Sequence, residues 1–157
     1  SGMLACGEDL GMVPDCVPGV MDHWKILSLE MTQMDKGHGW PTLSVCATSS
    51  HDMSTLRMQN AEAGKGDMAP WEVKRILWNH LSSRSMLAIF PLQDWVAIDE
   101  NLRRKDFMEE RVNQPADPLH HWRYRFHLPI SELTSEKASE LNVQIEGLLK
   151  DSGRFEA

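Results

Sequence analysis

The stretch LSVCATSSHD, residues 43–52, passes from a short, mostly apolar run into two serines, a histidine and an aspartate. The run at 43–48 does not alternate between apolar and charged residues, which is typical of a strand covered on both faces of a parallel sheet. Polar groups that follow such a strand lie at its carboxyl end, where α/β barrels carry their active sites. The stretch therefore predicts a buried parallel strand with a candidate site, His51 and Asp52, at its end.

Similar apolar runs and helical patterns alternate along the rest of the chain. Three further runs are expected to be strands: 3–7, 26–30 and 86–90. Three stretches repeat apolar residues every three or four positions and are expected to be helices: 14–24, the stretch from Pro70, and 135–150. The stretches 32–41 and 99–121 are expected to be irregular. Because strands that alternate with helices form parallel βαβ units, the predicted fold class is α/β.

The length limits how such units can be arranged. The chain has 157 residues, enough for one domain with a core of its own. A closed (β/α)8 barrel takes eight strands and about 250 residues. Four strands therefore form either a small open sheet or one part of a larger barrel.

Composition excludes some classes of partner. The net charge of −7 argues against nucleic acid or an anionic membrane, since both attract a basic face. The three cysteines show no framework spacing and are expected to be reduced thiols in a cytoplasmic protein. No signal peptide or transmembrane run is evident. Neither a zinc-like spacing around His120, His121 and His127 nor a glycine-rich phosphate motif occurs, so no metal or cofactor is expected.

A second carboxylate cluster follows the first expected strand. The stretch ACGEDLG, residues 5–11, places Glu8 and Asp9 there. Ionised carboxylates are costly to bury, so they either lie at the mouth of a fold or do chemistry there. Because the carboxyl ends of parallel strands meet at one edge, Glu8 and Asp52 are expected to converge, and two such carboxylates with a histidine suit glycoside chemistry. The alternative is that these carboxylates cap a helix or bind a basic neighbour.

Tryptophans and charges have competing interpretations. Trp40 lies between Gly39 and Pro41 and either stacks on a sugar or packs within its loop. Three tryptophans on or beside helical stripes are expected in the core: Trp24, Trp71 and Trp78. Trp122 is expected to pack against neighbouring arginines. The charged run 102–111 is expected to be a solvated surface segment whose ion pairs contribute little.

Four motifs, in this order, carry a family resemblance: CGEDLGMVPDCV, LSVCATSSHDMSTLR, PLQDWVAIDE and ERVNQPADPLHHWRYR. Together they resemble the carboxyl-terminal part of the amylomaltases, the 4-alpha-glucanotransferases of glycoside hydrolase family 77, from about Leu4 to Arg154. The family has a TIM (β/α)8 barrel. The resemblance therefore implies that residues 1–157 are a partial catalytic barrel domain, the carboxyl-terminal half with about strands 5 to 8, and that the amino-terminal half is absent.

The resemblance also implies an activity and roles for particular residues. The family transfers α-1,4-glucan segments by a retaining double displacement, without a cofactor, between α-1,4-glucan, maltose or malto-oligosaccharides and acceptors such as glucose. Its general acid/base falls on Glu8 and its transition-state stabiliser on Asp52. Further positions match family segments near the substrate and are candidate sugar ligands: His51, Gln93, Asp94 and Asn113.

This chain departs from the family pattern in two places. The family's nucleophilic aspartate lies on the strand before GEDLG, and no residue here matches it, so the isolated chain is expected to be inactive. The family also continues after Thr-Leu-Arg with Gly-Trp-Trp, whereas Arg57 is followed here by Met58. In the family that loop normally lies beside the substrate. This sequence has no residues that match it.

Two other functions remain open. A half barrel exposes an apolar edge, so the chain is expected to associate with a second copy or with the missing amino-terminal half. It could accordingly be a non-catalytic glucan-binding or assembly module. A retaining α-glucan hydrolase would use the same carboxylates, because hydrolysis and transfer differ in what accepts the glycosyl group.

Overall fold

The computed structural model describes residues 2–32, 39–120 and 122–154, which form two compact units. Unit 1 consists of Ser1–Ala47 and Ser83–Ile89, and unit 2 of Thr48–Ser82 and Phe90–Ala157. Most of the expected loop at 32–41 lies outside the described residues.

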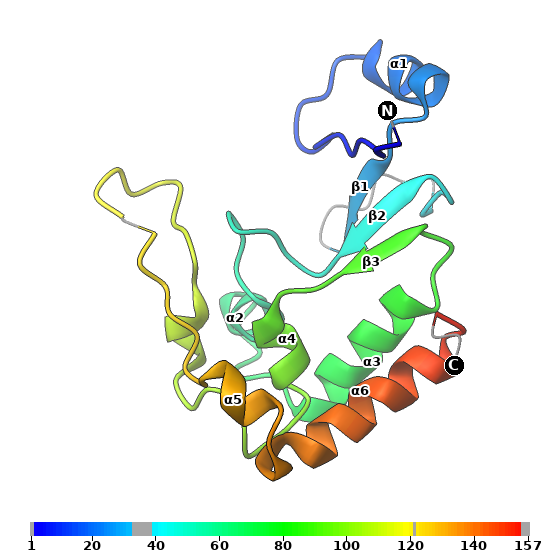
Figure 1. The fold of residues 1–157 in the computed structure, drawn as a ribbon. Helices are drawn as coiled ribbons and strands as arrows, with labels where there is room; N and C mark the ends of the chain where they lie inside the picture. Colours follow the sequence, from blue (N-terminus) through cyan, green and yellow to red (C-terminus); the bar gives the residue numbers. More distant parts are fainter. Residues whose placement is uncertain (1, 33–38, 121, 155–157) are drawn as a thin grey trace. The chain divides into compact units, whose positions relative to one another are not determined.

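Unit 1 contains a parallel sheet of three strands in the order β1-β2-β3 (Figure 1). The strands are β1 (Ser28–Met31), β2 (Ser44–Ala47) and β3 (Leu87–Ile89). The register places Val45 of β2 opposite both Leu29 and Leu87. Every residue of the central strand β2 is buried, as its apolar sequence predicts. The strands expected at 26–30, 43–48 and 86–90 are thus confirmed; each is shorter than expected, and β1 ends one residue later, at Met31.

The strand expected at 3–7 is reduced to a single parallel bridge between Cys6 and Leu27. Two backbone hydrogen bonds make it: Gly7 N donates to Leu27 O at 2.8 Å, and Leu27 N donates to Ala5 O at 2.8 Å. A Cβ atom at Gly7 would lie 3.1 Å from Met21 Cε. Glycine at this position therefore lets the segment approach the helix that follows it.

That helix, α1 (Val17–Trp24), begins three residues later than the expected 14–24. The preceding turn is closed by Val17 N donating to Pro14 O at 2.9 Å, so Pro14 belongs to the turn and not to the helix. The helix ends at Trp24 and is followed by Lys25, which caps it with a left-handed φ of 54°. The buried apolar side chains of unit 1 come from α1, the sheet and the residue before it: Met21, Leu27, Met31, Val45, Cys46 and Ala47.

Unit 2 is helical. Its elements are α2 (Leu56–Glu62), α3 (Pro70–Leu81), α4 (Leu92–Val96), α5 (Ile130–Leu133), α6 (Ser139–Asp151) and two 3₁₀ turns, η1 (Phe107–Glu110) and η2 (Glu136–Ala138). Helices α3 and α6 lie side by side (Figure 1). Their inward faces supply buried residues that the helical spacing predicts: Val73, Leu77, Leu81, Leu141 and Leu148.

The two expected long helices are confirmed, with local signals at their starts. Pro70 occupies the first turn of α3, and Glu72 Oε2 accepts a hydrogen bond from Ala69 N at 2.9 Å. The last helix begins at Ser139 and not at 135, because η2 occupies the preceding residues. The Ser135 side chain accepts from Lys137 N at the start of that turn.

The expectation that three tryptophans lie in the core is wrong. Trp24, Trp71 and Trp78 are 70%, 64% and 44% exposed. Trp71 lies instead under the Arg75 guanidinium, 5.7 Å from its ring centroid, where an indole keeps one face on the protein and one in water.

Cys6 and Cys16 are exposed, and Cys46 is buried in β2. Within the described ranges, no helix is long and apolar enough to cross a membrane.

Candidate active site

The candidate site is built on the segment that joins β2 to α2, residues 48–56. Asp52 lies in it with its carboxylate held from two sides. Asn113 Nδ2 donates to Asp52 Oδ1 at 2.6 Å, and His51 Nε2 lies 3.0 Å from Asp52 Oδ2. The side chains of His51 and Asp52 are 53% and 42% exposed. The cluster of Asp52, His51 and Asn113, called the Asp52 cluster below, is therefore open to a ligand.

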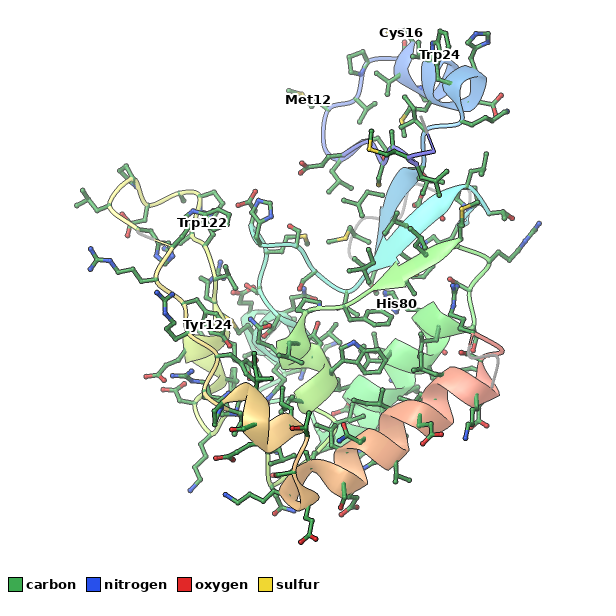
Figure 2. The ribbon with its side chains drawn as sticks, viewed as in Figure 1. Met12, Cys16, Trp24, His80, Trp122 and Tyr124 are labelled. Atoms are coloured by element: carbon green, nitrogen blue, oxygen red, sulfur yellow. The ribbon has the colours of Figure 1, made fainter. Side chains whose placement is uncertain are left out.

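An aromatic ring borders this cluster. The Trp122 ring centroid lies 5.0 Å from that of His51, with the ring planes tilted by 41°. Trp122 is 59% exposed. Figure 2 labels it on the long loop that follows η1. The structure thus records a contact of the Trp122 ring with His51, in place of the expected packing against neighbouring arginines. An exposed indole beside polar groups is a surface on which a sugar ring can lie.

Local hydrogen bonds fold the segment 48–56 into a turn. Met53 N donates to Ser50 O at 3.1 Å, which closes a turn around Asp52. Asp52 N donates to Ser50 Oγ at 3.3 Å. From α2, Gln59 Nε2 donates to Ser54 O at 2.6 Å. These hydrogen bonds fix the backbone around Asp52 in a turn, and the Asp52 side chain extends from that turn.

Asp94, at the start of α4, lies behind this segment and is fully buried. Its Oδ2 accepts from Thr48 Oγ1 at 2.6 Å, and its Oδ1 accepts from Leu56 N at 3.0 Å. Burial raises the pKa of Asp94 to about 6, and the nearby Glu110 carboxylate adds to that effect. The two hydrogen bonds and the charge of Arg57 act in the opposite direction.

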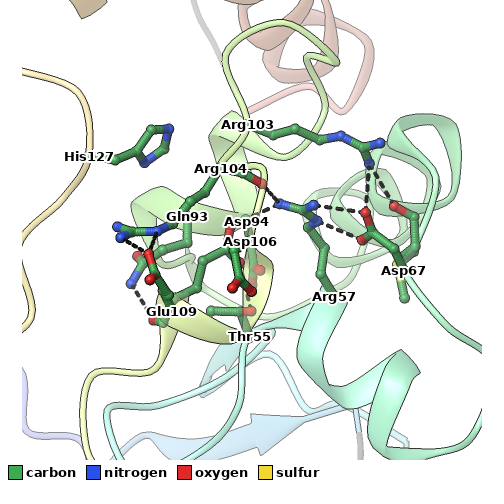
Figure 3. Close-up of polar contacts among 12 residues, drawn as sticks. Thr55, Arg57, Asp67, Gln93, Asp94, Arg103, Arg104, Asp106, Glu109 and His127 are labelled. Carbon is green, nitrogen blue, oxygen red and sulfur yellow. Dashed lines mark hydrogen bonds and ion pairs between the residues drawn. The ribbon is translucent and has the colours of Figure 1, made fainter.

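A buried ion-pair network follows the segment, centred on Arg57 of α2 (Figure 3). The Arg57 side chain is 1% exposed. Its Nε and Nη2 donate to the two oxygens of Asp67, each at 2.8 Å. Its Nη1 donates to Glu110 Oε1 at 3.0 Å and to the Arg104 carbonyl at 2.8 Å. Glu110 Oε2 in turn accepts from Thr55 Oγ1 at 2.9 Å, which links the network to the site segment.

The charged groups in this network shift one another's pKa values. Burial tends to raise the pKa of Asp67, but hydrogen bonds and charge from Arg57 outweigh it and lower that pKa. Burial raises the pKa of Glu110, against the opposing influence of Arg57 and Thr55. Burial tends to lower the pKa of Arg57, yet its two carboxylate partners hold it above the ordinary value. Arg57 is therefore a fixed positive charge.

The expectation that the run 102–111 is a solvated surface segment is wrong for Glu110. Glu110 is 2% exposed and pairs with Arg57 in the interior. The reason is that Arg57 lies 53 positions away in the sequence, so local charge patterning does not reveal the partner. Arg104 and Glu109 form the surface pair that the run predicts, with Glu109 59% exposed.

Gln93 lies beside this network and is 8% exposed. Its Nε2 donates to Glu110 O at 3.3 Å. Gln93 and Asp94 thus both occupy the interior behind the segment 48–56 and not its exposed side.

The remaining sequence candidates belong to unit 1. Glu8 is exposed, and Trp40 is half-buried. Asp9 Oδ1 accepts from Leu29 N at 2.8 Å, so this carboxylate binds the backbone where β1 begins. The structure therefore brings together Asp52, His51 and Asn113 within unit 2, while Glu8 and Trp40 are described in unit 1 alone. In the described part of the chain, no group of three or more His, Cys, Asp or Glu side chains is arranged to hold a metal ion.

Comparison with known proteins gives a consistent family signal. Residues 1–131 match the family model of glycoside hydrolase family 77, described as 4-alpha-glucanotransferase. A 4-alpha-glucanotransferase of Oryza sativa subsp. japonica, DPE2, is 34% identical over 179 aligned positions, which cover 98% of this chain and 19% of that protein. A 4-alpha-glucanotransferase of Chlamydia trachomatis serovar D is 27% identical, over 94% of this chain and 32% of that protein.

A solved structure shares the fold. The amylomaltase from Streptococcus agalactiae in complex with acarbose superposes with a TM-score of 0.68 at 12% identity, over 95% of this chain and 32% of that one. The chain thus spans between a fifth and a third of the length of these relatives. Its parallel three-stranded sheet and helices correspond to part of an amylomaltase.

Proposed function

This chain belongs to the 4-alpha-glucanotransferases of glycoside hydrolase family 77, and on that premise we propose that it carries part of a glucan-transferring active site. The observation that carries the proposal is the Asp52 carboxylate, held by Asn113 at 2.6 Å and by His51 at 3.0 Å on an exposed turn. A carboxylate fixed in this way stays oriented toward a ligand that enters from solvent.

The proposed chemistry is retaining glycosyl transfer. Glu8 protonates the oxygen of the glycosidic bond that breaks and later removes a proton from the hydroxyl of the acceptor sugar. Asp52 stays ionised and stabilises the positive charge that develops at the sugar ring in the transition state. His51 and Asn113 orient Asp52 and bind sugar hydroxyls.

The substrate class follows from the same cluster. An amylomaltase structure of the same fold contains acarbose, and we propose α-1,4-glucans, including maltose and malto-oligosaccharides, as donors for this chain, with glucose as an acceptor. Trp122, exposed beside His51, offers an apolar face to a sugar ring. Trp40 of unit 1 stays a sequence-based candidate for the same purpose. We also propose a cytoplasmic location.

A full reaction needs a nucleophile that no residue here matches. We propose that residues 1–157 form the carboxyl-terminal half of a (β/α)8 barrel, about strands 5 to 8, and that the nucleophilic aspartate is supplied by the amino-terminal half. The sheet of unit 1 supports this. In the described residues β3 has one strand partner, β2, and Leu87 and Ile89 of β3 are 41% and 58% exposed. We propose the amino-terminal barrel strands as the occupant of that edge.

The experiment is disproportionation of maltotriose to glucose and maltopentaose, followed by chromatography. We expect activity in the longest natural gene product that contains residues 1–157, and loss of at least about a thousandfold in Glu8→Gln or Asp52→Asn. We expect no turnover by the 157-residue chain alone. Full activity of either variant, or turnover by the isolated chain, would contradict the proposed roles. Release of glucose and maltose without maltopentaose would instead identify a hydrolase.

A further inference from the structure

Both ends of the segment that carries His51 and Asp52 are tied to one buried side chain. Thr48, where the segment leaves β2, donates its hydroxyl to Asp94 Oδ2 at 2.6 Å. Leu56, where α2 begins, donates its backbone N–H to Asp94 Oδ1 at 3.0 Å. The two oxygens of a single carboxylate thus span the segment and fix the separation of its ends.

Several other contacts of the segment lie near its α2 end. Glu110 accepts from Thr55, and Gln59 donates to Ser54, both close to α2. Gln59 also approaches the Thr48 carbonyl, but at 3.4 Å, which is long for a hydrogen bond. Asp94 thus binds both ends of the segment, at 2.6 Å and 3.0 Å, whereas the bond from Gln59 to the Thr48 end is longer.

We propose that Asp94 is a positioning residue, one that sets the conformation of segment 48–56 and so places the Asp52 carboxylate against Asn113. This inference rests on the proposed function, because the Asp52 cluster matters for catalysis only if it binds glucan. Asp94 is fully buried, so it acts through the segment and does not contact the sugar itself.

The proposal predicts which chemical property of Asp94 matters. Asparagine keeps the shape of the side chain. Its carbonyl oxygen can still accept from Leu56 N, and its amide group can donate to Thr48 Oγ1. Alanine removes both bonds and leaves the Leu56 N–H without its acceptor. A positioning role is therefore retained in Asp94→Asn and lost in Asp94→Ala, whereas a role that needs negative charge is lost in both.

The test is NMR titration of the 157-residue chain with acarbose, with circular dichroism to confirm folding. The proteins compared are the wild type, Asp94→Ala, Asp94→Asn and the control Leu141→Ala. Leu141 is buried in α6 of the same unit, so its truncation lowers stability without touching the segment. We expect Asp94→Ala to weaken binding by about tenfold or more, and both Asp94→Asn and Leu141→Ala to stay within about threefold.

If Asp94→Ala does not fold, Thr48→Val takes its place, because it removes one of the two bonds and is expected to weaken binding to an intermediate degree. Wild-type affinity in Asp94→Ala would overturn the proposal. So would an equal loss in Asp94→Asn, which would point to the charge, or in Leu141→Ala, which would point to stability alone.

Failure of the proposed function is distinguishable from failure of this inference. If the wild type does not bind acarbose, the glucan site is wrong, and the positioning role is then judged from the free protein. Asp94→Ala must accelerate hydrogen exchange at the Leu56 amide and abolish the nuclear Overhauser effect between the side chains of Asn113 and Asp52. Persistence of that effect would overturn the positioning role.

Discussion

Asn113 Nδ2 lies 2.6 Å from Asp52 Oδ1, although 61 positions separate the two residues in the sequence. The contact joins the turn after β2 to the irregular segment that follows η1. It leaves the second carboxylate oxygen to His51, so both oxygens of Asp52 have a defined direction. The proposed role of Asp52 depends on this arrangement.

Replacement of Asn113 by alanine is expected to weaken acarbose binding by about fivefold to tenfold, because it removes one hydrogen bond to a charged group at the site. Asn142→Ala is a matched control. Asn142, in α6, also donates its side-chain amide, but to Leu133 O at the end of α5, and its loss is expected to leave affinity unchanged. Titration of both variants checks this, and equal affinities would remove Asn113 from the site.

Trp122→Ala is expected to lower acarbose affinity by about tenfold, since the indole beside His51 offers the apolar face for a sugar ring. Trp71→Ala tests whether any exposed tryptophan has this effect. Trp71 is 64% exposed and Trp122 59%, but Trp71 lies on α3 against Arg75. A comparable loss in both variants would show that the effect is not specific to the Asp52 cluster.

Asp94 gives the stability a specific pH dependence. Its pKa is about 6 in the folded protein, against 3.8 as the ordinary value, so the folded state binds this proton more tightly than the unfolded chain does. The stabilisation is complete below the ordinary value and is lost as the pH rises through about 6. Asp94→Asn is neutral at every pH and should exceed the wild type in unfolding free energy by up to about 3 kcal/mol at neutral pH.

Urea unfolding of both proteins at about pH 4 and about pH 8 measures this difference. The gain from Asp94→Asn should shrink at the lower pH, where the wild-type carboxyl is itself protonated. A variant that is less stable than the wild type at the higher pH would show that the buried charge is well compensated.

Arg57→Met is expected to destabilise the protein by about 3–5 kcal/mol, because it leaves the buried carboxylate of Glu110 without its cation. It also removes the closer of the two cations beside Asp67, whose other partner, Arg103, lies 3.8 Å away. Adding Glu110→Gln should recover part of the loss. Arg104→Met is the control, since its partner Glu109 is on the surface and the pair should contribute less than about 1 kcal/mol. Equal losses from the two single variants in urea unfolding would contradict the buried network.

Local sequence patterns predict the regular elements well. The spacing of Val73, Leu77 and Leu81 and the proline at its start predict α3, and the apolar run around Val45 predicts β2. The segment 3–7 has the same apolar character, yet it contributes a single bridge. Elements as short as α4 and η1 carry too few residues to show a period.

The site is less accessible to sequence patterns, because its contacts are long-range. The pairs Thr48–Asp94, Arg57–Glu110 and His51–Trp122 join residues from distant segments. The sequence of a charged run does not show whether its side chains face water or a buried partner. For this reason the charge pattern predicts Glu110 at the surface. The family motifs name Asp52, His51 and Asn113, but their mutual geometry comes from the structure.

The most direct test of a glucan site at the Asp52 cluster is mapping of acarbose on the ¹⁵N-labelled 157-residue chain by chemical-shift changes. We predict saturable shifts concentrated at His51, Asp52, Asn113 and the Trp122 indole, and their loss in Asp52→Asn. Absence of shifts at these four residues, or unchanged binding by Asp52→Asn, would contradict the account.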